Sequence, residues 1–180
     1  MKEVSINKQA KISPHLASPS EAALSHLSEL NGLRLSPHFT LGELCKTSYH
    51  TLDGNIPSHV AIENLRNLCE NWLEDLRYSY NTLYADEEMP LIITSGYRSE
   101  EVNRLCGGAK GSNHLTGCAV DIRCMGPEHQ IRMASILLDI ADGTEREFDE
   151  LILEKRGSTR WIHFAVRPKD NRRKILFDCR

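Results

Sequence analysis

Apolar residues recur at steps of three and four positions between Pro57 and Tyr80, which is the pattern of a helix with one buried face. The residues on this face are Val60, Ile62, Leu65, Leu68, Cys69, Trp72, Leu73 and Leu76. A second long helix is predicted from Pro127 to Ala141, and a short helix is predicted from Glu100 to Cys106, ended by Gly107-Gly108. Helices are therefore expected along much of the chain.

Four short runs of apolar and β-branched residues have the pattern of strands. They cover residues 90–95, 118–123, 150–154 and 160–167. In the last run Trp161, His163 and Ala165 occupy alternate positions, as expected for a strand with two different faces. Strands interspersed with helices predict an α+β fold, in which a small antiparallel sheet is flanked by helices.

The two ends of the chain differ in composition from the middle. Residues 1–35 are rich in Ser, Lys, Glu and Ala, and beyond a short helical stretch at 21–30 they offer little that would anchor them to a core. We therefore expect a loosely ordered arm at 1–35, followed by one domain at 36–180. Residues 167–174 include several basic residues and are expected to form a solvated tail.

Length and composition limit the class of protein. A chain of 180 residues, 40% of them hydrophobic, can bury the core of one domain without disulfides, and we expect a monomer with reduced cysteines. The net charge of -3 argues against a nucleic-acid partner, because such partners require a basic face. The sequence contains neither the apolar run of a secretory signal nor one that could span a membrane. We expect a cytoplasmic product, as synthesised, with no membrane partner.

Three residues have the chemistry of a metal site. His114 and Asp121 are seven residues apart, and Gly117 between them can supply the turn that points both side chains at one spot. His163 lies on a predicted strand that a small sheet would bring alongside. Two imidazoles and one carboxylate are typical of a catalytic zinc, whose fourth position holds water. On spacing alone, each histidine is more often an ordinary surface or core residue than a ligand.

The residues around these three resemble the M15 zinc peptidases, whose pattern runs SGYR, N, GG, SxHxxGxAxD and WxH. The matching positions are Ser95-Gly96-Tyr97-Arg98, Asn103, Gly107-Gly108, Ser112 to Asp121 and Trp161-Ile162-His163. The resemblance covers about residues 36 to 170. It implies a fold like that of the Hedgehog and D,D-peptidase zinc proteins.

The resemblance also implies roles for individual residues. His114, Asp121 and His163 match the residues that bind zinc (Zn2+) in that family. Arg98 matches an arginine that contacts substrate and helps to stabilise the oxyanion, for which a permanently charged guanidinium is well suited.

Two further residues of the matching motifs are expected near the substrate. These are Ser112 and Trp161, which we predict to contact the substrate. Ser112 is also a candidate hydrogen-bonding partner behind the metal site, because metal-binding histidines are usually oriented by such a group.

One position departs from the family pattern. An acid usually stands three residues before the last histidine and acts as general base, whereas this chain has Arg160 there, and arginine cannot accept a proton at neutral pH. Glu154 is the preferred substitute, at the end of the apolar run 151–153. Glu150 and Asp149 are less favoured because they precede that run. If no carboxylate reaches the metal, the fold would bind zinc and peptide without turnover.

These features predict zinc-dependent hydrolysis of peptide bonds in peptidoglycan stem peptides, either as a D,D-carboxypeptidase or as an L-alanyl-D-glutamate peptidase. The alternative is a non-catalytic zinc-containing module that binds peptidoglycan or a protein. A third option is an intracellular peptidase unconnected with the cell wall. A lysis protein of phage or prophage origin, released to the wall through a membrane pore, would reconcile a wall substrate with a cytoplasmic site of synthesis. Processing of recycled wall fragments in the cytoplasm would do so equally.

Overall fold

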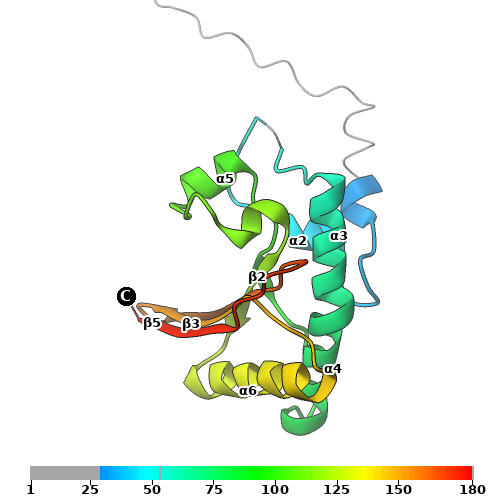
Figure 1. Cartoon of the computed structure of the whole chain (residues 1–180), viewed down its shortest axis with the longest axis vertical. Coiled ribbons are helices and arrows are strands. Elements are labelled where there is room, and N and C mark those ends of the chain that lie inside the picture. Colours follow the sequence, from blue (N-terminus) through cyan, green and yellow to red (C-terminus); the bar gives the residue numbers. More distant parts are fainter. Residues whose placement is uncertain (1–28, 53, 180) are drawn as a thin grey trace, which may run out of the picture.

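The computed structural model describes residues 29–52 and 54–179 (Figure 1). Residues 1–28, which make up most of the predicted arm, lie outside the described residues. Leu35 is 1% exposed and belongs to the hydrophobic core, so the core extends into the end of the segment predicted as an arm. Among the described residues, no helix combines the length and the apolar character needed to cross a bilayer.

The helices follow the apolar periodicity closely. They are α2 (Leu41–Leu44), α3 (His59–Leu68), a π-helical turn (Cys69–Leu73), α4 (Glu74–Tyr84), α5 (Glu100–Leu105) and α6 (Pro127–Thr144). The segment from α3 to α4 runs without a break, which confirms the predicted helix at 57–80. The predicted helices at 100–106 and 127–141 are confirmed as α5 and α6.

The strands of the described residues form one five-stranded sheet in the order β1-β2-β4-β3-β5. The strands are β1 (Ile93–Ser95), β2 (Ala119–Cys124), β3 (Glu150–Arg156), β4 (Thr159–Ala165) and β5 (Lys174–Cys179). The four predicted strands are confirmed, and so is the α+β class. The expectation of an antiparallel sheet is wrong at one edge, because β5 pairs parallel to β3.

The segment predicted as a solvated tail, residues 167–174, is instead tied to the domain by a buried carboxylate. Asp149 is 0% exposed, and Arg172 donates to it through Nε (2.7 Å) and Nη2 (2.6 Å). The Arg167 guanidinium lies 3.6 Å away. A buried carboxylate requires such partners, since leaving it unpaired is costly. This pairing holds the chain where β5 can add to the sheet.

The sheet has one covered face and one face that carries polar groups. Trp72, from the π-helical turn, packs against Phe164 of β4 with ring centroids 5.0 Å apart, and against Phe148 at 6.4 Å. These rings belong to the core between the sheet and the helices α3, α4 and α6 (Figure 1). Because side chains alternate along a strand, every second residue of β2, β3 and β4 points to the opposite face.

Gly117 connects the turn that carries His114 to strand β2. Its backbone is left-handed (φ +71), and a Cβ built there would lie 2.3 Å from the carbonyl oxygen of Ala61 in α3. Only glycine accepts both this conformation and this close approach without strain. The expectation that Gly117 supplies the turn between His114 and Asp121 is confirmed.

The Gly117→Ala substitution is expected to lower the free energy of unfolding by about 2 kcal/mol or more, because left-handed strain and steric overlap add together. Denaturant titration would measure the loss. The matched control is Gly111→Ala, since a Cβ at Gly111 meets nothing within 4 Å. Equal stability of the two variants would show that the close approach to α3 carries no cost.

Candidate metal centre

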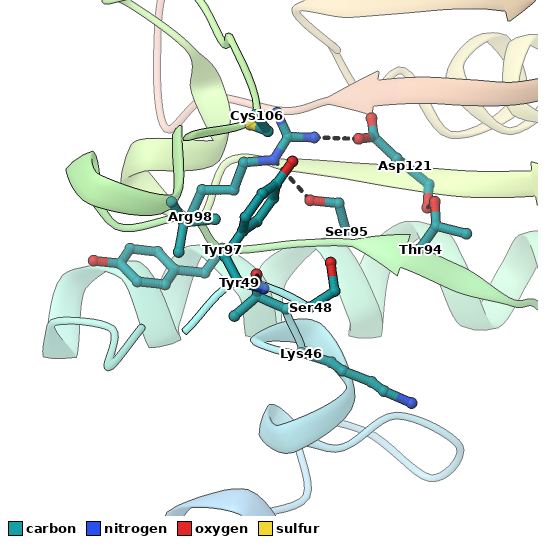
Figure 2. A pocket seen from close by; sticks show the side chains of 11 residues that line it. Lys46, Ser48, Tyr49, Thr94, Ser95, Tyr97, Arg98, Cys106 and Asp121 are labelled. Carbon is teal, nitrogen blue, oxygen red and sulfur yellow. Dashed lines mark hydrogen bonds and ion pairs between the residues drawn. The ribbon is translucent and has the colours of Figure 1, made fainter. Parts of the chain in front are cut away.

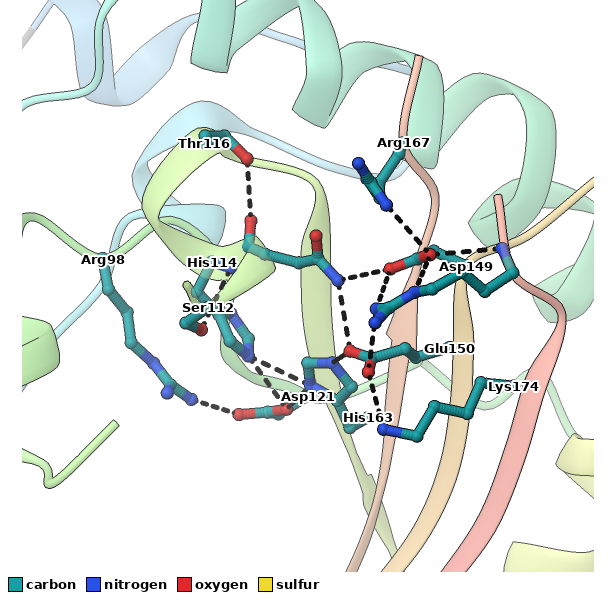
Figure 3. Close-up of polar contacts among 12 residues, drawn as sticks. Arg98, Ser112, His114, Thr116, Asp121, Asp149, Glu150, His163, Arg167 and Lys174 are labelled. Atoms are coloured by element: carbon teal, nitrogen blue, oxygen red, sulfur yellow. Dashed lines mark hydrogen bonds and ion pairs between the residues drawn. The ribbon is translucent and has the colours of Figure 1, made fainter. Parts of the chain in front are cut away.

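Three ligand atoms converge on the polar face of the sheet (Figure 3). His114 Nε2 lies 3.2 Å from Asp121 Oδ1 and 3.2 Å from His163 Nδ1, and the His163 and Asp121 atoms are 3.0 Å apart. All three residues are buried, with exposed fractions of 2–8%. The structure therefore brings together the three residues that the sequence analysis selected as metal ligands.

His114 is held from behind by the backbone. It lies in a 3-10 turn (Asn113–Thr116), and its Nδ1 is 2.6 Å from the carbonyl oxygen of Gly96. A carbonyl only accepts, so Nδ1 carries the proton and Nε2 presents a lone pair to the other two residues. Burial lowers the pKa of His114, which keeps the imidazole neutral as a ligand requires.

Asp121 and His163 are direct neighbours across the sheet. They are paired in the β2–β4 register, so their side chains leave the same face side by side. Burial opposes ionisation of Asp121, but His114 and His163 outweigh it and lower its pKa far below the usual range. Burial likewise opposes protonation of His163, yet the carboxylates of Asp121 and Glu150 raise its pKa to about 9. The carboxylates of Asp121 and Glu150 therefore favour a positive charge at the position of His163.

The spacing of the three atoms fits a metal ion. They form a nearly equilateral triangle with sides of 3.0–3.2 Å. Ligands at ~2.0–2.1 Å from a tetrahedral zinc are separated by ~3.3–3.4 Å, so a small expansion of the triangle accommodates the ion. The three residues qualify as a candidate metal-binding group within the described part of the chain. Two nitrogens and one oxygen are a donor set that zinc accepts.

Arg98 borders the metal triangle on the β1 side. Its guanidinium donates to Oδ2 of Asp121, the oxygen that faces away from the histidines, and its Nε donates to Ser95 Oγ at 2.7 Å. A pocket of about 260 Å³ opens here, and Arg98 reaches across it toward Asp121 (Figure 2). Tyr49 and Tyr97 also line the pocket. A permanent cation beside the triangle is suited to a carboxylate or a developing oxyanion.

Comparison with known proteins identifies the family. The sequence profile of the family Peptidase M15 matches residues 37–164. The chain belongs to the M15 peptidase family. No curated protein matches the chain. The resemblance seen in the motifs is confirmed, and the converging residues of this M15 peptidase lie within the matched region.

Glu150 contacts the metal triangle through His163. Its Oε2 is 3.5 Å from His163 Nε2, the ring nitrogen opposite the one that faces Asp121. The same oxygen accepts a hydrogen bond from Asn113 Nδ2 at 3.1 Å. Contact with His163, above all, lowers the pKa of Glu150 to about 2. A carboxylate in this place orients the imidazole of a metal ligand and is a weak base.

Glu154 lies on the same face of β3, four residues beyond Glu150 and directly opposite Trp161 of β4. It is partly buried, and burial raises its pKa, which the negative charge of Asp121 raises further. A carboxylate with a raised pKa is better suited to accept a proton near neutral pH than one held at about 2. The two acids on this face of β3 therefore differ, because the pKa of Glu154 is raised and that of Glu150 is lowered.

Arg160 does not lie on the metal face, which is the face of the sheet that carries Asp121 and His163. It stands three residues before His163 in a regular strand, and its Nη1 donates to Gln130 Oε1 of α6 at 3.2 Å. Its side chain is therefore on the helix-covered face, with the buried Ile162. In this strand an acid at position 160 would point away from His163. The departure from the family pattern thus carries no argument against a base elsewhere.

The two residues predicted to contact substrate have different positions. Ser112 Oγ accepts a hydrogen bond from the backbone N–H of His114 at 3.3 Å and caps the 3-10 turn. It supports the backbone of His114, while Gly96 orients the ring. Trp161 lies on the metal face between Glu154 and Arg123 in the sheet register.

Two of these contacts were not expected from the sequence, because Asn113 had no predicted role and Glu150 was less favoured than Glu154. Asn113 donates to Asp149 Oδ2 at 2.8 Å and to Glu150 Oε2, and it thereby ties the His114 turn to β3. Alternation along 150–154 would have placed Glu150 on the face of Glu154. Nothing in the sequence points to the contact with Asn113, because its partners are 36 and 37 residues away.

Proposed function

We propose that this M15 peptidase is a zinc-dependent hydrolase of peptide bonds in peptidoglycan stem peptides. The observation that carries the proposal is the triangle of His114 Nε2, Asp121 Oδ1 and His163 Nδ1, with sides of 3.0–3.2 Å. Such a group of three ligands leaves a coordination position for water, as in hydrolytic zinc sites. The proposal includes a fold like that of the Hedgehog and D,D-peptidase zinc proteins.

The residues in and around the triangle have different roles in the proposed hydrolysis. Zinc, when bound to His114, Asp121 and His163, would polarise the scissile carbonyl and lower the pKa of a water. Glu154 takes the proton from that water as general base and returns it to the leaving amine. Arg98 holds a substrate carboxylate or the developing oxyanion.

The substrate class rests on the family resemblance together with the pocket beside Arg98. The pocket of about 260 Å³ is small and has a cation and two tyrosines in its lining. These features suit a short peptide that ends in, or carries, a carboxylate. A D-alanyl-D-alanine terminus and an L-alanyl-D-glutamate bond both meet that description. A phage lysis protein would encounter either peptide after release to the wall.

The proposal is tested by a paired measurement on the full chain. Elemental analysis of the purified protein is expected to find close to one zinc per chain. Mass spectrometry of muropeptides incubated with the protein is expected to show loss of a D-alanine or a cut between L-alanine and D-glutamate, and a chelator should stop it. Intact muropeptides after long incubation with the zinc-loaded protein would contradict the catalytic proposal.

The rival proposal is a zinc-containing module that binds peptidoglycan or a protein without turnover. Its basis is Arg160, which stands where the family usually has an acid. The Arg160 side chain lies on the opposite face of the sheet from His163, so its identity does not argue against catalysis. Tight muropeptide binding at full zinc occupancy without any product would favour it. Faster cleavage of ordinary L-peptides than of muropeptides would favour a peptidase unconnected with the wall.

The Arg98→Lys substitution is expected to lower kcat/KM by about 10²–10³-fold with zinc content unchanged. Lysine keeps the charge but loses the planar fork that reaches Ser95 and Asp121 together. Steady-state kinetics on the cleaved muropeptide measures the effect. The control is Arg104→Lys in the nearby helix α5, where the side chain is 72% exposed. Full activity of the Arg98 variant would remove this residue from the mechanism.

A further inference from the structure

Strand β5 forms the outer edge of the sheet (Figure 1). It carries exposed apolar side chains on both of its faces. Ile175, Leu176 and Phe177 are 44%, 41% and 74% exposed. An exposed edge strand is a template for pairing with another strand, and charges or prolines usually protect it. In β5 the charged residues are Lys174 and Asp178, on either side of this apolar centre, and Lys174 Nζ also donates to Glu150 Oε1 at 3.3 Å.

The backbone of β5 has a defined set of outward groups. The N–H of Lys174 donates to the carbonyl oxygen of Asp149 at 2.9 Å, so Lys174 faces β3. In a parallel pair, residues that bond the neighbouring strand alternate with residues that point away from it. Ile175 and Phe177 therefore direct N–H and C=O groups outward, where no strand of the described residues pairs with them.

We propose that β5 pairs antiparallel with β5 of a second copy of this chain, centred on Leu176. In this register Lys174 stands opposite Asp178 of the second copy, Ile175 stands opposite Phe177, and Leu176 meets its own counterpart. Opposite charges face each other at both ends, and apolar residues face each other between them. The sequence of β5 is thus complementary to itself when reversed.

The backbone geometry selects the same register. In an antiparallel ladder, the two residues of a hydrogen-bonded pair both direct their N–H and C=O groups at the partner strand. Ile175 and Phe177 are the residues whose groups point outward, and this register pairs them with each other. A shift of one residue would set an outward residue against an inward one and break the ladder.

The pairing would join two sheets into one with both metal faces on the same side. Antiparallel neighbours in a sheet are related by a two-fold axis perpendicular to it, which keeps corresponding faces together. Five strand spacings separate the two copies of β4, so the two His163 residues would be about 24 Å apart. A dimer of this kind presents two sites to one surface. It differs from the sequence-based expectation of a monomer.

The dimer is expected to be weak and reversible. Pairing of one six-residue strand per copy buries less area than the ~1,200–2,000 Å² of stable complexes. Sedimentation velocity of the full chain over a concentration series should therefore show a monomer that converts to a dimer. A single monomeric species at every concentration would overturn the proposal.

The register is tested by reversing one charge at a time. Lys174→Asp and Asp178→Lys each place like charges opposite each other at both ends of the symmetric interface, and each should weaken dimerisation about tenfold. An equimolar mixture of the two variant chains restores opposite charges at both ends and should dimerise as the unchanged chain does. A mixture that associates no better than the separate variants would refute this register.

Two controls separate the interface from general effects of charge. Lys110→Asp and Asp86→Lys make the same charge changes at exposed positions away from β5 and should leave the dimer unchanged. Phe177→Lys should weaken dimerisation, whereas Leu83→Lys in α4, where Leu83 is 63% exposed, should not. A dimer that survives Phe177→Lys would place the interface elsewhere and overturn the proposal.

Discussion

Replacing His114 with alanine is expected to abolish metal binding and to lower peptide hydrolysis by at least ~10³-fold, because a bound metal contributes several kcal/mol to transition-state stabilisation. His114 Nε2 is one corner of the ligand triangle, and its ring is fixed by Gly96. With the imidazole gone, Asp121 and His163 remain as two ligands, too few for a stable zinc site.

Elemental analysis and muropeptide cleavage, measured on the same preparation, would check this result. The control is His59→Ala, which removes an exposed histidine at the start of α3 and should keep both zinc and activity. Circular dichroism should show that the His114 variant is folded. Unchanged zinc content in the folded His114→Ala protein would contradict the assignment of the metal centre.

The Glu154→Gln substitution is expected to lower kcat by about 10²–10⁴-fold while the protein keeps its metal, as expected when a general base is removed. Glu154 stands on the metal face, and burial together with the charge of Asp121 raises its pKa. Glutamine has the same shape but accepts no proton at neutral pH. Single-turnover cleavage of muropeptides by the zinc-loaded variant measures the loss.

Glu150→Gln is the matched comparison, since the two acids are four residues apart on one face of β3. Glu150 contacts His163 Nε2, so its loss should weaken metal affinity by about 10–100-fold. Added zinc should then restore most of the turnover. The opposite pattern, with full activity in the Glu154 variant and no turnover in zinc-loaded Glu150→Gln, would make Glu150 the base.

Elements with strong local periodicity were predictable. The apolar face at three- and four-residue steps marked the helix that runs from α3 to α4, and alternation marked β4, because each pattern reports which face is buried. Strand β5 was missed. The basic segment before it, residues 167–174, was expected to be a solvated tail, and what positions the strand is the pairing of Arg172 with Asp149, 23 residues earlier.

The candidate metal ligands were predictable for a different reason. His114 and Asp121 belong to one short motif, in which Gly117 adopts the left-handed turn that the motif requires. The order of preference among Glu154, Glu150 and Asp149 as general base had less support in the sequence. Only the pairing of β3 with β4 shows that Glu150 touches His163 and that Arg160 points into the helix-covered face.

The sequence by itself determined the long helical segments, four of the five strands of the described sheet, and the three residues that converge as candidate metal ligands, because these depend on periodicity and short motifs. Only the tertiary structure decided the parallel edge strand, the face on which Arg160 lies and the partner of each acid. Those features depend on strand register and on the pairing of buried charges between distant residues. A register is set by the packing of the whole sheet, and no local pattern encodes it.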